Sequence, residues 1–213
     1  MNPGLTLRSV SEKVDLIDLG LGNIGSIETA LLRSGIRSEV LSGGQRPASK
    51  VVILPGVGHF TSGVEALDTL EMRHTIVDHV NSGGSLIGIC LGMQLLGATS
   101  EEGPGNGLSL LDFCSRRILA DGASGGPVMG WRTPKLLEKG WLSREGQERY
   151  YFMHDYGVTE INSDLVKMTH SVGQEIIASS VGRGRVIGFQ FHPERSLKFG
   201  QEILASAVRE LSN

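Results

Sequence analysis

The sequence predicts an α/β fold: an open, mostly parallel sheet flanked by helices, with extra antiparallel strands in the C-terminal half. Short runs of Val, Ile and Leu, bounded by glycine, recur along the chain, and such runs are typical of strands buried on both faces. Segments with the three- and four-residue spacing of amphipathic helices lie between them. This alternation of strand and helix favours a parallel sheet covered by helices.

The first part of the chain carries the clearest elements. Buried strands are expected at the apolar runs 14–20, 51–56 and 85–90, and a fourth at 185–191. A helix is expected over 23–35, which ends at Gly35, a favoured helix terminator. Two further helices are expected, at 92–100 and 196–212, and a polar helical stretch is visible over 71–80.

The middle of the chain, from about 105 to 185, has a different pattern. Its apolar runs are shorter, as at 149–153 and 176–181, and Gly, Ser and Asp separate them. We expect extra strands and loops there, in an order that the pattern does not define. Because no repeat, long linker or low-complexity tract appears, we expect one domain over 1–213, with 1–12 as a possible loose extension.

Composition excludes several classes of protein. The net charge of −3 and the pI near 6.1 provide no basic surface for nucleic acid. The two cysteines, Cys90 and Cys114, are too few for a disulfide framework and lack the CxxC spacing of a zinc site. There is neither a signal-peptide core nor an apolar run of about 18 residues that could cross a membrane. We therefore expect a cytoplasmic protein.

The segment GICLG places Cys90 between two glycines, directly after an apolar run and before a helical pattern. A nucleophile at a sharp strand-to-helix turn needs small neighbours, because the backbones crowd one another there. The start of the following helix favours a thiolate, the reactive form of cysteine. The backbone N–H of Leu91, the next residue, is then placed to stabilise an oxyanion. The alternative is that Cys90 is simply a small buried apolar residue.

A base for this cysteine is expected at His192, in the segment FQFHPERS. The segment follows the last apolar run, and Pro193 biases His192 towards an extended backbone. Side chains two residues apart point the same way in extended chain, so Glu194 can orient the imidazole, as the third member of a catalytic triad does. An ordinary surface turn remains the alternative.

The other histidines fit this role less well. His74 and His79 lie in the polar helical stretch, and His170 has no nearby carboxylate in the sequence. His59 and His154 follow more suggestive segments, PGVG and YYFM, but neither has a carboxylate two residues on. The PGVG turn itself suits a second oxyanion donor, because its glycines let backbone N–H groups approach a ligand closely.

Five segments in this order, PGVGHF, GICLGMQLL, MGW, YFMH and GFQFHPERS, resemble one family. The chain is similar to class I (triad) glutamine amidotransferases, and within them to the glutaminase subunits of imidazole glycerol phosphate synthase, from about residue 13 to the C-terminus. The resemblance implies hydrolysis of glutamine to glutamate and ammonia through a cysteine thioester, without metal or cofactor. It makes Cys90 the nucleophile, His192 the base and Glu194 its orienter.

The same resemblance implies roles for further residues. Val57 joins Leu91 as an oxyanion donor, its peptide turning the N–H inward on activation. Seven residues match positions that hold glutamine: Gly56, Gly58, Gln94, Glu102, His154, Asp155 and Tyr156. Four others match the face towards the synthase partner, which in this family is a (β/α)₈-barrel cyclase that receives ammonia through a tunnel: Asn23, Trp131, Tyr151 and Arg195.

A partner is also indicated by the chain itself, which has no GxxxxGK[ST] loop and no GxGxxG segment that opens a helix for a second substrate. The resemblance implies a heterodimer that makes imidazole glycerol phosphate and an aminoimidazole carboxamide ribotide in histidine biosynthesis. Leu19, Arg132, Asp155 and Arg195 depart from the usual family pattern. They leave open a paralogous subunit that supplies ammonia to a synthase amidinating surface sugars. A non-catalytic regulatory subunit and an elbow-type cysteine peptidase or stress protein are more remote alternatives.

Overall fold

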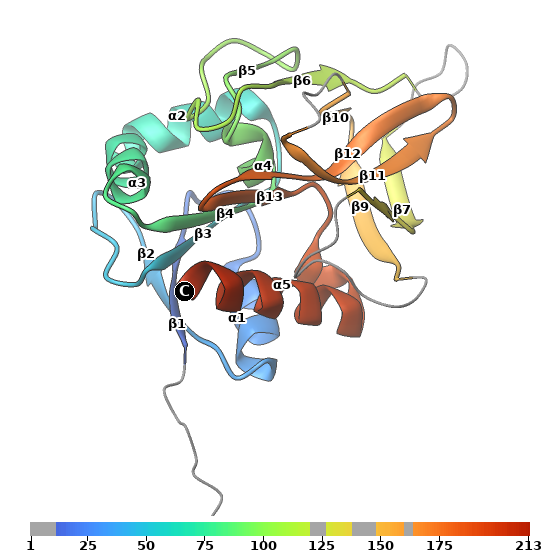
Figure 1. Ribbon diagram of the computed structural model, residues 1–213. Coiled ribbons are helices and arrows are strands. Elements are labelled where there is room, and N and C mark those ends of the chain that lie inside the picture. The colour runs from blue at the N-terminus through green and yellow to red at the C-terminus, as the bar shows by residue number, and fades with distance from the viewer. Residues whose placement is uncertain (1–11, 120–126, 138–147, 160–163) are drawn as a thin grey trace, which may run out of the picture.

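The computed structural model describes residues 12–119, 127–137, 148–159 and 164–213. Within these ranges an eight-stranded sheet runs through the centre of the molecule, in the order β2-β1-β3-β4-β13-β12-β11-β8 (Figure 1). The strands span Lys13–Ile17 (β1), Arg37–Leu41 (β2), Val51–Gly56 (β3), Ser85–Cys90 (β4), Lys135–Leu136 (β8), Val166–Val172 (β11), Glu175–Arg183 (β12) and Val186–Phe189 (β13).

The sheet has a parallel part and an antiparallel part. Strands β2, β1, β3, β4 and β13 pair in parallel. Strands β12, β11 and β8 extend the sheet antiparallel from β13. The predicted fold class is therefore confirmed, including the antiparallel strands in the C-terminal half.

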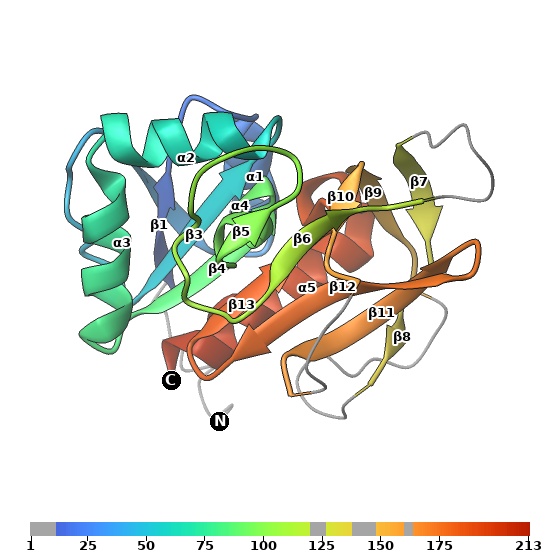
Figure 2. The ribbon, with the colours of Figure 1, turned by 90° about the horizontal axis from the view of Figure 1, so that it is seen from above.

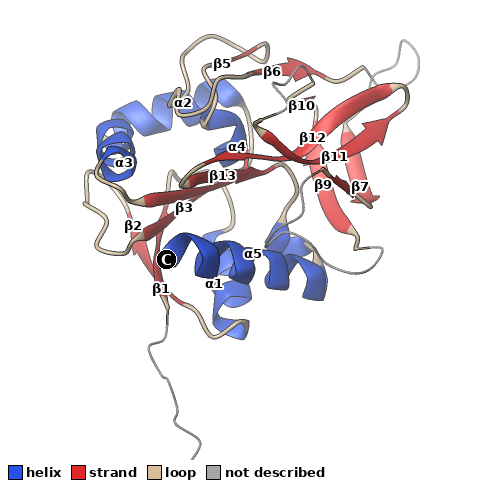
Figure 3. Ribbon diagram, viewed as in Figure 1, coloured by secondary structure: helices blue, strands red, loops and turns tan. Residues whose placement is uncertain are grey.

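Helices cover both faces of the sheet (Figures 1 and 3). Helices α1 (Ile24–Arg33) and α5 (Leu197–Ser212) pack on one face, where Ile27, Leu31 and Ile203 join the first core cluster. Helices α2 (Phe60–Thr69), α3 (Met72–Asn81) and α4 (Leu91–Leu95) pack on the other, around Phe60 and Met72. Because both faces are covered, strands β3 and β4 are buried at every position, which explains their unbroken apolar sequences.

Two small sheets lie outside the main one, and the sheet of β7 and β9 is on the side of the antiparallel strands (Figure 2). One consists of β10 (Tyr156–Gly157), β6 (Cys114–Arg117) and β5 (Thr99–Ser100), and the other of β7 (Val128–Arg132) and β9 (Tyr150–His154). They connect through the short bend at Asp155 between β9 and β10. Apart from β5, which precedes the middle segment, these strands together with β8, β11 and β12 are the extra strands expected there.

The helix expected over 92–100 was predicted too long. Helix α4 ends at Leu95, and β5 follows at Thr99. Carbonyl groups that a longer helix would use accept bonds from a returning loop instead: Leu108 N–H donates to Leu95 O at 2.7 Å. A Cβ on Gly97 would lie 2.4 Å from the Phe113 ring, so the chain must turn at a glycine there.

Strand β2 and helix α2 were not predicted. Strand β2 lies at the sheet edge with Arg37 and Glu39 exposed, so it lacks the apolar run of a buried strand. Helix α2 does carry an amphipathic signal in the spacing of Phe60, Val64 and Leu67, which are all buried. The helical stretch over 71–80 is confirmed as α3, and the segment 1–11 lies outside the described residues. No helix in the described ranges has the length and apolar character required to cross a membrane.

Candidate active site

Cys90 stands at the strand-to-helix turn that the sequence predicted. It is the last residue of β4 and the cap before α4, with φ of 55° and ψ of −109°. A positive φ in a residue other than glycine costs about 1–3 kcal/mol, and such strain is concentrated at functional sites. Cys90 is 5% exposed, and its Sγ lies 3.9 Å from Met153 O.

The two glycines that flank this turn are required by close backbone contacts. A Cβ on Gly88 would lie 2.6 Å from Gly92 O, and a Cβ on Gly92 would lie 1.8 Å from Leu54 O in the neighbouring strand. Neither oxygen can move without breaking the sheet or the helix. The backbone crowding expected at this turn is thus confirmed.

His192 and Glu194 form a hydrogen-bonded pair. His192 Nδ1 donates to Glu194 Oε1 at 2.8 Å, and the imidazole is 2% exposed. His192 has the expected extended backbone, and its N–H donates to Tyr151 O at 2.9 Å. Glu194, however, lies in a 3₁₀ turn, η1 (Pro193–Arg195), and not in extended chain. The contact was predicted correctly and its local geometry wrongly, because Pro193 is well suited to begin a helical turn.

The electrostatic surroundings of His192 favour its protonated form. Burial alone would lower its pKa, but the adjoining Cys90 sulfur and Glu194 carboxylate outweigh burial and raise the pKa to about 10. Nδ1 is bonded to Glu194, and Nε2 is buried with no hydrogen bond to any described residue. Nε2 is therefore the nitrogen left to exchange a proton with Cys90. The resulting imidazolium would stabilise a thiolate at the sulfur.

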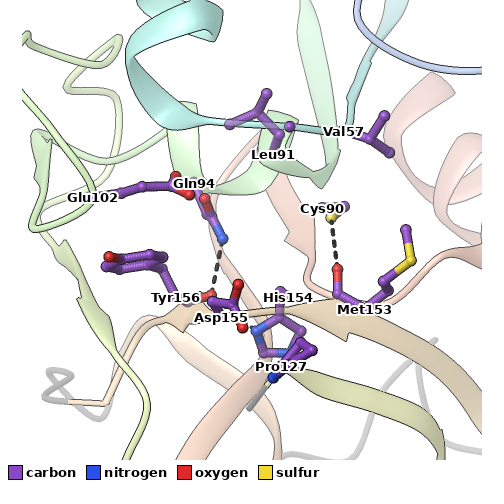
Figure 4. A pocket seen from close by; sticks show the side chains of 11 residues that line it. Val57, Cys90, Leu91, Gln94, Glu102, Pro127, Met153, His154, Asp155 and Tyr156 are labelled. Carbon is purple, nitrogen blue, oxygen red and sulfur yellow. Dashed lines mark hydrogen bonds between the residues drawn. The ribbon is translucent and has the colours of Figure 1, made fainter. Parts of the chain in front are cut away.

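A cavity of about 220 Å³ opens beside Cys90 (Figure 4). It brings together most of the residues that the sequence predicted for substrate and oxyanion binding. Its walls come mainly from the loop after β3, the turn into α4, the loop after β5 and the segment around the β9–β10 bend. They consist of Val57, Gly58, Cys90, Leu91, Gln94, Glu102, Pro127, Met153, His154, Asp155 and Tyr156. Gly56 lies just behind, where a Cβ would meet the Leu91 side chain at 3.1 Å.

The carbonyl oxygen of Tyr156 organises one side of this cavity. It accepts bonds from Gln94 Nε2 at 2.9 Å and from His154 Nδ1 at 2.8 Å. Burial is the main reason why the pKa of His154 falls to about 3, with smaller contributions from His170, His192 and Arg132. His154 is therefore neutral, with its proton on Nδ1. It is not suited to replace His192 as the base.

Glu102 and the two predicted oxyanion donors lie around the same cavity. Glu102 Oε2 accepts the N–H of Phe60 at 2.7 Å, which fixes the carboxylate against the start of α2. The N–H of Leu91 is in the first turn of α4, where helical N–H groups have no acceptor within the helix. The N–H of Val57 instead donates to Leu21 O at 3.1 Å and so is occupied outside the cavity.

Three of the residues predicted for the partner face form one cluster. Trp131 and Tyr151 are paired across β7 and β9, with ring centroids 5.8 Å apart. The Arg195 guanidinium lies 5.5 Å from the centre of the Tyr151 ring, and it also contacts Met153 Sδ at 3.8 Å. Asn23 is separate from this cluster. It caps α1 by accepting the Ser26 N–H, and it lines a groove that also includes Glu194.

Sequence reasoning missed three residues at the site. Met153 accepts the Cys90 thiol at its carbonyl, Pro127 lines the cavity, and Leu21 binds the Val57 N–H. Two of them act through the main chain and one through a small apolar side chain. No signal in residue type could have identified them. Across the described ranges, no group of three or more His, Cys, Asp or Glu is arranged to hold a metal ion.

Comparisons with known proteins support the chemistry that this geometry suggests. The chain is 34% identical over 197 residues to imidazole glycerol phosphate synthase subunit HisH 2 of Pseudomonas aeruginosa, covering 91% of this chain and 97% of the relative. It is 38% identical over 195 residues to subunit HisH of Moorella thermoacetica, covering 90% and 91%. It is 33% identical over 204 residues to the HisH subunit of Prochlorococcus marinus, covering 93% and 98%.

Solved structures support the fold. PurLQS from Thermotoga maritima matches with a TM-score of 0.74 at 18% identity, covering 94% of this chain and 99% of that chain. A glutamine amidotransferase structure matches with a TM-score of 0.68 at 20% identity, covering 93% and 98%. The family model described as glutamine amidotransferase class-I matches residues 15–211. The chain belongs to the class I glutamine amidotransferase family.

Proposed function

We propose that this chain is the glutaminase subunit of an imidazole glycerol phosphate synthase. It hydrolyses glutamine to glutamate and ammonia, and a cyclase subunit uses the ammonia to make imidazole glycerol phosphate and an aminoimidazole carboxamide ribotide in histidine biosynthesis. The observation that carries the proposal is the strained Cys90 turn beside the bonded pair of His192 and Glu194, at the wall of a cavity. The near full-length similarity to HisH subunits supports the assignment to this pathway.

The first half of the reaction forms a thioester. The Cys90 thiolate attacks the carboxamide carbon of glutamine, and the carbonyl oxygen becomes an oxyanion that the N–H of Leu91 stabilises. His192, which is protonated at neutral pH because its pKa is raised to about 10, gives its Nε2 proton to the leaving nitrogen. The carbon–nitrogen bond then breaks, and ammonia departs.

The second half regenerates the enzyme. Neutral His192 takes a proton from water as the water oxygen attacks the thioester carbon. The carbon–sulfur bond breaks, glutamate leaves, and the thiolate–imidazolium pair forms again. Glu194 holds Nδ1 throughout, so that Nε2 remains the nitrogen that faces the reaction. No step requires a metal or a cofactor.

The cavity supplies the contacts that glutamine requires. Gln94 lies one helical turn beyond Cys90, and Tyr156 O and the neutral His154 maintain its orientation. Glu102 offers a carboxylate to the α-ammonium group of the substrate. Gly56 and Gly58 leave room for the substrate near Cys90, and the main chain at Asp155 and Tyr156 lies within the cavity wall.

The loop after β3, which carries Val57 and Gly58, supports a chain with low glutaminase activity until its partner subunit binds. The N–H of Val57 is bonded to Leu21 O, so only the N–H of Leu91 is available to an oxyanion. A peptide flip at Val57 would bring in the second donor. Gly58 makes that flip feasible, because its φ of 112° is open to glycine, and a Cβ placed there would meet no atom within 4 Å.

The partner we propose is a (β/α)₈-barrel cyclase in a cytoplasmic heterodimer, which receives ammonia through an internal tunnel. The cluster of Trp131, Tyr151 and Arg195 is the proposed docking surface, since it adjoins His192 through the backbone of Tyr151. Asn23 follows the Leu21 loop that holds Val57 and would connect docking to the flip. We further propose that 1–213 forms one domain.

The test of this function is Cys90→Ala in the complete synthase. Glutamine-dependent activity should fall by several orders of magnitude, because loss of a triad member usually has that effect. Activity with added ammonium salt should remain, since the cyclase does not use Cys90. Cys114→Ala, at the other free cysteine, is the matched control and should leave both activities intact. Glutamine-dependent activity that survives Cys90→Ala within about tenfold would contradict the assignment.

A further inference from the structure

The charges around the cavity are unbalanced. Its described walls include two carboxylates, Glu102 and Asp155, and no lysine or arginine. The imidazole in the wall, His154, is neutral because burial lowers its pKa to about 3. Among the described wall residues, a ligand in this cavity therefore meets two carboxylates and no lysine or arginine.

Asp155 has the more unusual position of the two carboxylates. Its main-chain carbonyl accepts the Ile118 N–H at 3.0 Å, which fixes the bend between β9 and β10. Its side chain is exposed and makes no hydrogen bond or ion pair with any described residue. Figure 4 shows this side chain among those that surround the cavity, near His154 and Tyr156. The carboxylate is thus free to act on a ligand by charge.

Glu102 differs because one of its oxygens is already bound to the Phe60 N–H. It has a fixed position suited to the α-ammonium group of an amino acid. A second carboxylate on the wall adds attraction for that ammonium group, and it repels an α-carboxylate. Free glutamine has both groups. A derivative whose α-carboxyl is uncharged has only the first.

We propose that Asp155 makes this cavity favour glutamine derivatives with a free α-ammonium and an uncharged α-carboxyl group, so that L-glutamine amide is also a substrate. The inference rests on the proposed glutaminase function and extends its substrate class. In the added reaction, the Cys90 thiolate displaces ammonia from the side-chain carboxamide. Water then hydrolyses the thioester, giving L-isoglutamine in place of glutamate.

Binding can be measured without a partner protein or turnover. In a Cys90→Ala background, calorimetry gives the Kd of L-glutamine and of L-glutamine amide, each with Asp155 and with Asp155→Asn. The amide should bind at least as tightly as glutamine when Asp155 is present. The ratio of the two Kd values should shift by about fivefold in favour of glutamine in Asp155→Asn, as expected for unit charges about 4 Å apart in a water-like medium.

The ratio of the two Kd values distinguishes an electrostatic role of Asp155 from a structural one. A merely structural role of Asp155 would change both Kd values by the same factor and leave the ratio constant. Asp78→Asn, which removes an exposed carboxylate on α3 away from the cavity, is the matched control and should leave the ratio unchanged. Asp155→Ser provides a second variant if Asp155→Asn folds poorly. Raised salt should also reduce the shift, because the groups are near solvent.

Each outcome bears on a different statement. A ratio that changes less than about twofold in both Asp155 variants would overturn the role of Asp155. An amide that binds more than about tenfold weaker than glutamine with Asp155 present would overturn the extended substrate class. Failure of both ligands to bind would contradict the glutamine site, and therefore the proposed function itself. In the complete synthase, release of isoglutamine from the amide is the corresponding positive result.

Discussion

Two glycine-containing turns lie side by side at the active site and behave in opposite ways. The Cys90 turn follows β4 and the Val57 turn follows β3, and Gly56 is paired with Cys90 across these neighbouring strands. In the first turn, glycines at 88 and 92 are required because any Cβ would collide with backbone oxygens. In the second, Gly58 lies in open space with a positive φ.

The difference shows that glycine can fix a backbone or free it. Around Cys90, close packing permits a single arrangement and holds the residue in a strained conformation. Around Val57, a hydrogen bond from its N–H to Leu21 O holds the peptide in its present orientation. We infer that the first turn carries the chemistry and the second its regulation.

The largest expected effect is the loss of stability caused by adding a Cβ in the Cys90 turn. Gly92→Ala would place a carbon 1.8 Å from Leu54 O, so we expect a loss of about 3 kcal/mol or more in the free energy of unfolding, or no folded protein. Gly58→Ala should fold, because its Cβ meets nothing, although its positive φ makes it strained. Thermal unfolding of the two variants measures this contrast. Equal destabilisation would show that both turns are fixed.

His192→Asn should have the next largest effect, a loss of about 10³-fold or more in glutamine hydrolysis by the complete synthase. Without the imidazole, neither thiolate formation nor proton delivery to ammonia is supported. Steady-state glutamate production gives the value. His170→Asn, at a buried histidine bonded to Ser179 and outside the cavity wall, is the control for loss of an imidazole. Unimpaired thioester formation in His192→Asn would indicate another base.

Glu194→Gln should be about tenfold or more less damaging than His192→Asn. The amide removes the charge that supports the imidazolium, but the imidazole itself remains. The same glutamate assay compares the two variants. A Glu194→Gln enzyme as inactive as His192→Asn would mean that the carboxylate does more than orient and stabilise His192.

The Val57 turn predicts a smaller effect: the partner and the acceptor nucleotide should raise the rate of glutamine hydrolysis about a hundredfold. Removing one oxyanion donor costs about 10²- to 10³-fold in rate, and the Val57 N–H is not available in the isolated chain. Glutamate production is measured for the chain alone, with cyclase, and with cyclase and nucleotide. Full activity of the isolated chain would contradict the coupling. No response to the nucleotide would favour the surface-sugar synthase as partner.

The smallest expected effect is the change of folding stability with pH that His192 causes. The pKa of His192 is raised from 6.5 to about 10 by Cys90 and Glu194, although burial opposes the shift. A raised folded-state pKa stabilises the fold fully below about 6.5, and this contribution is lost as the pH rises through 10. NMR titration of the His192 ring should give a lower pKa in Cys90→Ala. An unchanged pKa would remove Cys90 as a cause.

Much of the active site could be predicted because its signals are local. Cys90 has its flanking glycines, and His192 has a carboxylate two residues away. Both follow apolar runs that are typical of buried strands. The edge strand β2 escaped prediction, because exposed strands lack such runs, and α4 was predicted too long, because its end depends on a loop more than ten residues later in the chain.

The sequence by itself determined the α/β class, the position of Cys90 at a strand-to-helix turn and the pairing of His192 with Glu194, since each depends on residues close together in the chain. Tertiary structure alone decided that Val57 binds Leu21 O, that Met153 O faces Cys90, and that Arg195 lies beside the Tyr151 ring. These contacts join distant segments, and two of them involve main-chain atoms. Every residue carries the same main-chain groups, so only packing selects which of them meet.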